Sequence, residues 1–189
     1  MKKNICVYCS SSNNLDEKYY KLAQELGHKI ASKGYGLVYG GTIVGCMGQV
    51  ANAVIHNGGE AIGVIPELIE SKGLGHPELA KIIITKDMRE RKATMEEHSN
   101  IFLAIPGGFG TFEEIFEILV AKQLGYHKKA VIFLNLDDYY TPLFQMFENI
   151  YREKFAKEQS RELYYIADSI DEVFDYISTY EEKDFIMKW

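Results

Sequence analysis

The chain has 189 residues, 47% of them hydrophobic and 25% charged, which is enough for one globular domain with a sizeable core. Its net charge of −6 argues against a surface for nucleic acid or anionic membranes. No apolar stretch approaches the roughly 20 residues of a membrane-spanning helix, and the basic N-terminus precedes too short an apolar run for a signal peptide. We therefore expect a single domain over residues 1–189, with no nucleic-acid or membrane partner.

Three cysteines, Cys6, Cys9 and Cys46, form no paired framework, which suits a reducing compartment. Cys6 and Cys9 have the spacing of a redox motif or of half a zinc site. Both lie in or just after a predicted strand, however, and the chain contains no second pair. We therefore expect a cytoplasmic location and no metal site.

Strands and helices alternate along the chain. Short apolar runs predict buried strands, and apolar residues at helical spacing predict the helices between them. The predicted strands are residues 5–9, 36–39, 61–65, 81–85, 101–105, 130–134 and 163–167. The predicted helices are residues 16–33, 47–56, 88–99, 111–124, 139–154 and 169–180. Residues 66–80 are the least regular stretch and are a candidate lid or partner surface.

This alternation predicts an α/β fold, with a parallel sheet of about seven strands covered by helices on both faces. Right-handed crossovers bring the carboxyl ends of all the strands to one edge, and ligands bind at this edge where the strand order reverses. Four stretches should meet there: residues 10–12, 40–48, 89–92 and 107–114.

The sequence PGGFGTFEE at residues 106–114 follows a buried strand and opens a helix. Its three glycines let backbone N–H groups approach a ligand, and the first turn of a helix favours an anion. The glycine spacing is not that of the dinucleotide fingerprint or of the P-loop. The stretch predicts a phosphate site without identifying a nucleotide. An ordinary tight turn with an acid-rich helix start is the alternative interpretation.

Three cations, Arg89, Arg91 and Lys92, lie in the first turns of the predicted helix 88–99, where they oppose the helix dipole. A functional role would explain this position. The alternative for Arg91 and Lys92 is a solvent-exposed face with salt bridges to Glu96 or Glu97.

Together these groups suit a phosphorylated sugar whose reacting carbon lies close to its phosphate. A carboxylate from residues 113–114 beside an anomeric carbon can steer water or stabilise an oxocarbenium-like transition state. A nearby arginine can hold the substrate and balance the charge of the acid.

The motif at residues 106–114 resembles the PGGxGTxxE signature of the LOG ("lonely guy") phosphoribohydrolases. Residues 88–95, MRERKATM, resemble that family's companion motif, an Arg-Lys pair followed by Met. Residues 40–48, 63–66 and 123–127 resemble further landmarks, and the similarity covers about residues 5–140. The family is often labelled lysine decarboxylase-like. We do not expect that activity, since nothing resembles a Schiff-base lysine site with a cofactor-anchoring acid.

The resemblance implies a Rossmann-like fold that hydrolyses the N-glycosidic bond of cytokinin riboside 5′-monophosphates or AMP. It implies no metal or organic cofactor and at least a homodimer. Carried over to this chain, Arg91 and Glu114 are the catalytic pair. The implied substrate-binding residues are Lys92, Gly107, Gly108, Gly110, Thr111, Glu113, Ser11, Gly41 and Met88. Of these, the resemblance implies that Gly107, Gly108, Gly110 and Thr111 hold the phosphate. Glu114 takes the inward role, and Glu113 contacts the helix start or a substrate hydroxyl.

Five positions depart from the family pattern and leave the base preference open: Ser10, Thr42, Gly73, Arg89 and Ala121. The main alternative function is a non-catalytic nucleotide or molybdenum-cofactor carrier of the same superfamily. A carrier needs the phosphate site but not the acid–arginine pair, so Arg91 and Glu114 favour the enzyme.

Overall fold

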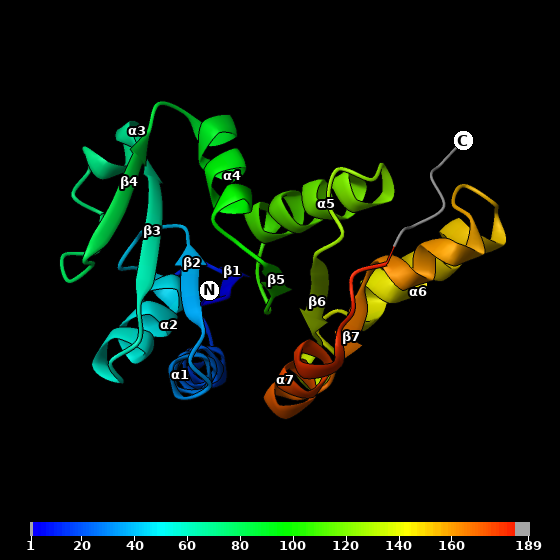
Figure 1. Cartoon of the computed structure of the whole chain (residues 1–189), viewed down its shortest axis with the longest axis horizontal. Helices are drawn as coiled ribbons and strands as arrows, with labels where there is room; N and C mark the ends of the chain where they lie inside the picture. Colours follow the sequence, from blue (N-terminus) through cyan, green and yellow to red (C-terminus); the bar gives the residue numbers. More distant parts are fainter. Residues whose placement is uncertain (1, 184–189) are drawn as a thin grey trace.

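A seven-stranded parallel sheet runs through the middle of the protein, as expected from the sequence (Figure 1). The computed structural model describes residues 2–183. In chain order the strands are β1 (Asn4–Tyr8), β2 (Gly36–Tyr39), β3 (Ala61–Pro66), β4 (Lys81–Thr85), β5 (Ile101–Ala104), β6 (Ala130–Leu134) and β7 (Tyr165–Ala167). Their order in the sheet is β4-β3-β2-β1-β5-β6-β7.

Helices cover both faces of the sheet and complete a three-layer, Rossmann-like fold (Figure 1). One face carries α1 (Glu17–Ser32), α2 (Gly45–His56) and α7 (Ile170–Thr179). The other carries α4 (Met88–Glu97), α5 (Phe109–Gln123) and α6 (Thr141–Arg152). The short helix α3 (Glu67–Glu70) follows β3 near the β4 edge. Among residues 2–183, no helix is long and apolar enough to cross a membrane.

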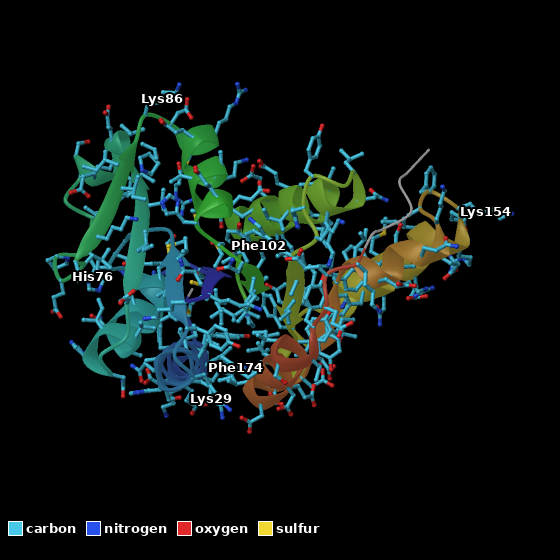
Figure 2. The ribbon with its side chains drawn as sticks, viewed as in Figure 1. Lys29, His76, Lys86, Phe102, Lys154 and Phe174 are labelled. Atoms are coloured by element: carbon cyan, nitrogen blue, oxygen red, sulfur yellow. The ribbon has the colours of Figure 1, made fainter. Side chains whose placement is uncertain are left out.

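Each face of the sheet has its own apolar core. Alternate side chains of a strand point to opposite faces, so Ile5 and Val7 join the core under α1 and α2 while Cys6 and Tyr8 join the core under α4 and α5. Phe102 of β5 lies in the second core, in the interior of the molecule (Figure 2). This two-sided burial explains why the strands appear in the sequence as continuous apolar runs.

Several boundaries differ from the expected ones. Helix α2 begins at Gly45, two residues before the expected start, because the Asn13 side chain accepts a hydrogen bond from the Gly45 N–H at 2.8 Å. Residues 66–80 contain α3, which has no buried residue. Two 3₁₀ helices, Leu136–Asp138 and Glu158–Leu163, precede α6 and β7, so β7 begins at Tyr165.

The strand order reverses between β1 and β5. The chain moves outward from β1 to β4 and then returns to place β5 against β1, with Tyr8 paired to Ala104. The loops that follow β1, β2 and β5 therefore meet at one edge of the sheet. This is the position at which ligands bind in open α/β sheets.

Candidate active site

A cavity of about 580 Å³ lies at this reversal of strand order. The loops after β1, β2 and β5, the start of α4 and part of residues 66–80 line it. It brings together seven of the site residues expected from the sequence: Ser11, Met88, Arg91, Gly108, Gly110, Thr111 and Glu114. Residues from five separate stretches of the chain thus form one cavity.

Arg91 and Glu114 form a buried ion pair in this cavity. Arg91 Nη1 donates to Glu114 Oε1 at 2.5 Å, and each side chain is only 5% exposed. Arg91 Nε also donates to the Val64 carbonyl oxygen at 3.0 Å, which fixes the guanidinium plane. A Cβ at Gly40 would lie 2.2 Å from Arg91 Nη2, so a side chain at that position would displace the arginine.

Burial raises the pKa of the Glu114 carboxyl above its ordinary value, and the Arg91 guanidinium opposes this shift. The ion pair therefore supports a carboxylate that has lost most of its hydration. A poorly hydrated carboxylate interacts strongly with positive charge that develops beside it. Glu114 is suited to stabilise a cationic reaction centre in the cavity.

Lys92 and Glu113 lie outside the cavity. Lys92 Nζ donates to the carboxylates of Glu113 and Glu117, which are about half exposed. Adjacent residues of a helix point about 100° apart, so Glu114 turns inward while Glu113 turns toward α4. Arg91 and Lys92 pair with α5, and not with Glu96 or Glu97 as the alternative interpretation had it.

An N-terminal cap explains how α4 tolerates its cations. Asp87 Oδ1 accepts hydrogen bonds from the N–H groups of Arg89 and Glu90, each at 2.9 Å. Glu90 in turn accepts from the Lys86 N–H at 2.8 Å. These two carboxylates offset the basic residues in the first turns of α4. The cap keeps Arg91 on a regular helix facing α5.

Helices α2, α4 and α5 all begin beside the cavity, and α4 is capped by Asp87. Among residues 2–183, only α5 of these three has an N-terminus without a capping group. At α2, the Asn13 side chain and the Ser10 carbonyl accept hydrogen bonds from the N–H groups of Gly45 and Cys46. No side chain caps α5, where Gly108 is the N-cap. Since the first N–H groups of a helix have no partner within it, residues 109–111 can bind an anion.

Two tyrosines that follow β6 support the glycine turn before α5. Tyr139 Oη donates to the Gly107 carbonyl at 2.7 Å, and Tyr140 Oη donates to the Ile105 carbonyl at 2.7 Å. Gly107 itself lines a smaller adjoining cavity of about 170 Å³, which shares Ser10 and Gly108 with the main one. These contacts hold the turn in place from behind.

Gly41 does not line the main cavity. It has a φ of +76°, and a Cβ there would come within 3.1 to 3.3 Å of Val64 and Ile65. Its carbonyl accepts from the His76 N–H, and the neighbouring Ile43 N–H donates to the Leu74 carbonyl. Gly41 thus anchors residues 66–80 beside the cavity.

Sequence reasoning missed several lining residues. Residues 66–80 contribute Ile69, Lys72 and Leu74, and the loop after β2 with the start of α2 contributes Val44 and Met47. The irregularity of residues 66–80 suggested a lid, but a stretch without periodicity does not reveal which side chains face inward. Of the five departures from the family pattern, Ser10 and Thr42 line the cavity.

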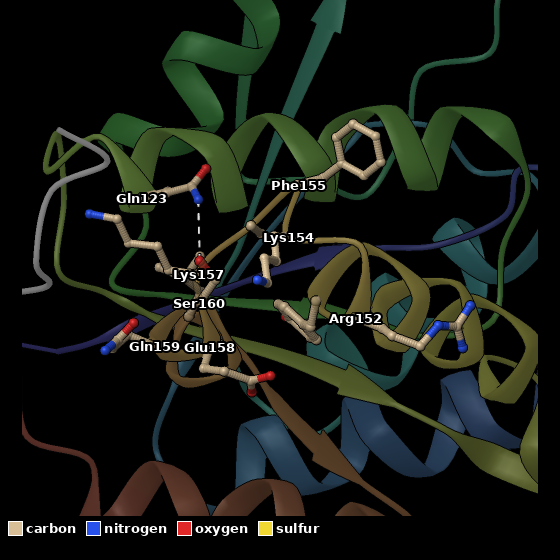
Figure 3. A pocket seen from close by; sticks show the side chains of 11 residues that line it. Gln123, Arg152, Lys154, Phe155, Lys157, Glu158, Gln159 and Ser160 are labelled. Atoms are coloured by element: carbon tan, nitrogen blue, oxygen red, sulfur yellow. Dashed lines mark hydrogen bonds between the residues drawn. The ribbon is translucent and has the colours of Figure 1, made fainter.

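A larger cavity of about 770 Å³ lies near the end of α6, away from the carboxyl ends of the strands (Figure 3). Gln123 of α5 donates to Ser160 at 3.3 Å across its wall. The long side chains of Arg152 and Lys157 point in opposite directions and do not converge on a common point (Figure 3). Convergent polar groups, which a binding site needs, are found in the smaller cavity instead.

The cysteines are free and buried, and Cys9 lines the main cavity. Burial raises the pKa of Cys6 to about 12 and that of Cys46 to about 11, so both remain protonated at neutral pH. Across residues 2–183 no group of His, Cys, Asp and Glu side chains is arranged to hold a metal ion.

The fold and the site define a Rossmann-like protein with an open helix terminus beside a buried acid–arginine pair. Residues 47–177 match the family model described as "Possible lysine decarboxylase". The chain belongs to this family, whose LOG members its two motifs resemble.

Plant proteins are similar over nearly the whole chain, beyond the expected residues 5–140. The cytokinin riboside 5′-monophosphate phosphoribohydrolase LOG5 of Arabidopsis thaliana is 36% identical over 95% of this chain and 78% of its own. The probable phosphoribohydrolase LOGL2 of Oryza sativa subsp. japonica is 37% identical over 99% and 78%.

Among solved structures, the molybdenum cofactor binding protein of Rippkaea orientalis has a TM-score of 0.74 at 23% identity, covering 95% of this chain and 97% of its own. This likeness shows the common fold.

Proposed function

We propose that this protein hydrolyses the N-glycosidic bond of nucleoside 5′-monophosphates, either cytokinin riboside 5′-monophosphates or AMP, releasing the free base and ribose 5-phosphate. The observation that carries the proposal is the buried Arg91–Glu114 pair, one helical turn from the open start of α5. The names of the plant relatives support the same reaction.

In the proposed mechanism, the 5′-phosphate binds the N–H groups of residues 109–111 and the Thr111 hydroxyl. The ribose then lies against Glu114, whose carboxylate stabilises the oxocarbenium-like transition state and orients the attacking water. Arg91 fixes Glu114 and contacts the sugar. The reaction as proposed requires no metal or organic cofactor.

Cofactor carriage is the alternative. The solved molybdenum-cofactor proteins are 22–23% identical to this chain, and their likeness extends to the fold alone. A carrier needs the anion site, but it gains nothing from a buried carboxylate in the cavity. Glu114 therefore favours hydrolysis.

We further infer that the protein is a cytoplasmic homodimer. The family resemblance supports the dimer, and the free cysteines suit a reducing compartment. Phe109, at the cavity, is 94% exposed and offers an apolar contact for a second copy.

The experiment compares Glu114→Gln with Glu113→Gln, a matched change on the adjacent residue. Glu114→Gln keeps the shape but removes the charge, so we expect kcat for AMP to fall on the order of 10²-fold or more. Direct AMP binding should persist because backbone groups of α5 hold the phosphate. Glu113→Gln should have a milder effect, since its carboxylate lies outside the cavity.

Single-turnover cleavage and AMP binding are measured for both variants and for Arg91→Ala, which should lose activity and bind more weakly. A Glu114→Gln variant that cleaves at nearly the wild-type rate would contradict the catalytic assignment and favour the carrier.

A further inference from the structure

Lys72 is the third charged side chain of the cavity. The other two, Arg91 and Glu114, pair with each other. The Lys72 ammonium group has no hydrogen-bond or ion-pair partner among residues 2–183; only its backbone N–H is bonded, to the Ile69 carbonyl. Lys92, in contrast, is held by two carboxylates of α5. The cavity therefore contains one cation that is available to a ligand.

A polar part and an apolar part of the lining come from different strand ends of the sheet: the polar part follows β1 and β5, and the apolar part follows β2, β3 and β4. Hydroxyl groups of Ser10 to Ser12 and the backbone of residues 108–111 form the polar part, which suits the phosphate and ribose. The apolar part contains Val44, Met47, Ile69, Leu74 and Met88. Lys72 lines the cavity from the stretch after β3 that also supplies Ile69 and Leu74, so it enters from the apolar side.

The proposed function determines which end of the substrate reaches Lys72. With the phosphate at α5 and the anomeric carbon at Glu114, the planar base occupies the apolar part. An ammonium group has only hydrogen-bond donors, so it can bind an acceptor nitrogen or oxygen of the base but not an exocyclic amino group. It also favours any negative charge that collects there.

Resting on that function, we propose that Lys72 is a catalytic residue that stabilises the departing base. When the C1′–N9 bond of a purine nucleotide breaks, its electron pair moves to the base, and the oxygen of water bonds to C1′. One proton of that water completes the neutral free base. Lys72 donates a hydrogen bond to a ring acceptor of the base and stabilises the negative charge until the proton arrives.

The test compares two leaving groups on the same sugar phosphate. AMP has a strongly basic leaving group, whereas 4-nitrophenyl ribose 5-phosphate releases a stable phenolate that needs little help. Lys72→Met keeps the length of the side chain and removes its charge; Lys72→Arg keeps the charge. Lys81→Met, at an exposed lysine of β4 outside the cavity, is the matched control.

We expect Lys72→Met to lower kcat for AMP roughly 10- to 100-fold and kcat for the nitrophenyl compound less than about 3-fold. Lys72→Arg should recover most of the AMP activity, and Lys81→Met should match the wild type. Equal losses on both substrates, or a higher KM with unchanged kcat, would overturn the proposal, because they would place Lys72 at the phosphate or in the fold.

Failure of the proposed function and failure of the Lys72 inference give different experimental results. A wild-type protein that cleaves neither compound contradicts the proposed function and this inference with it. A wild-type protein that cleaves AMP, together with a Lys72→Met variant that cleaves it equally fast, contradicts this inference alone.

Discussion

At the scale of single residues, burying the Arg91–Glu114 pair carries a large desolvation penalty. Two charged side chains that are each 5% exposed have lost most of their hydration. Their mutual attraction offsets this lost hydration free energy only while both are present. Removing one partner leaves the other uncompensated, which typically costs about 3–5 kcal/mol. Stability measurements should therefore accompany the kinetics of every variant at these two positions.

His127 should make the fold sensitive to acid. Its Nδ1 accepts from the Lys129 N–H at 3.2 Å, so Nε2 carries the proton and donates to the Ile118 carbonyl at 2.9 Å. Burial lowers the pKa of His127 to about 4 from an ordinary 6.5, and the nearby ammonium groups of Lys129 and Lys122 act in the same direction. The neutral imidazole is thus the form that fits.

Because the pKa of His127 is depressed in the folded state, the unfolded chain binds more protons between pH 6.5 and 4, and stability falls as the pH falls through this window. We expect His127 to account for roughly 1–2 kcal/mol of lost unfolding free energy between pH 7 and pH 5. Urea unfolding at both pH values measures it. His127→Gln should show a correspondingly smaller difference between the two pH values; an unchanged difference would refute the assignment.

Sequence patterns correctly predicted that Arg91 and Glu114 meet at one edge of the sheet, but they predicted the other residues of the cavity wall poorly. Glu114 and Arg91 lie in short motifs at fixed offsets from a strand and a helix, so their meeting followed from parallel-sheet topology. Lys72 and Leu74 lie in a segment whose position depends on contacts with the loop after β2, such as the Thr42–Gly75 bridge. Such contacts between distant residues leave no periodic signal in the sequence.

At the scale of elements, the N-terminal cap of α4 should determine how rigidly the first turns of this helix hold Arg91 against Glu114. Asp87 accepts hydrogen bonds from the backbone N–H groups of Glu90 and Arg89, and both of these bonds lower the pKa of its carboxyl. We expect Asp87→Ala to reduce the unfolding free energy, because both donors lose their partner. Asp87→Ser, which can still cap, is the control.

Chemical denaturation gives the stability of both variants, and amide hydrogen exchange over residues 88–91 reports the fraying of the helix. Equal stability of Asp87→Ala and Asp87→Ser would show that the cap contributes nothing.

The bounds of helices and strands were predicted most accurately where the hydrophobic pattern of the sequence itself stops at the end of the element. The strands at residues 36–39, 81–85 and 130–134 have the expected bounds. Helix α2 starts earlier than expected because a side chain from the loop after β1 caps it, and no pattern within residues 45–56 records that partner. Boundaries set by distant residues are the part that sequence periodicity cannot provide.

At the scale of the whole molecule, exposed apolar side chains on and near α5 predict self-association. Val120 is 49% exposed and Phe109 94%. In helix α4, by comparison, Met88 is the exposed large apolar residue. The contact should therefore centre on α5.

We expect a dimer at micromolar concentration, and Val120→Glu should shift it toward monomer because a buried, unpaired carboxylate is costly. Ile84→Glu is the control, since Ile84 is 52% exposed on the edge strand β4, whereas α5 packs on β1 and β5 in the middle of the sheet. Light scattering or sedimentation measures both. A wild-type monomer, or equal dissociation of the two variants, would contradict this surface.

The tyrosine contacts behind the glycine turn would allow residues that do not touch the ligand to change the affinity of the proposed anion site. Tyr140 is 1% exposed and touches the turn through one hydroxyl, while its ring packs against Phe133 and Phe144. Because the turn is already ordered, binding costs little loop entropy. Substitutions at Phe133 or Phe144, which pack against the Tyr140 ring, would loosen the turn, so that ligand binding would have to order it. The ligand affinity would then fall although no group that touches the ligand had changed. This aromatic cluster is a place where natural variation can set affinity while the chemistry stays constant.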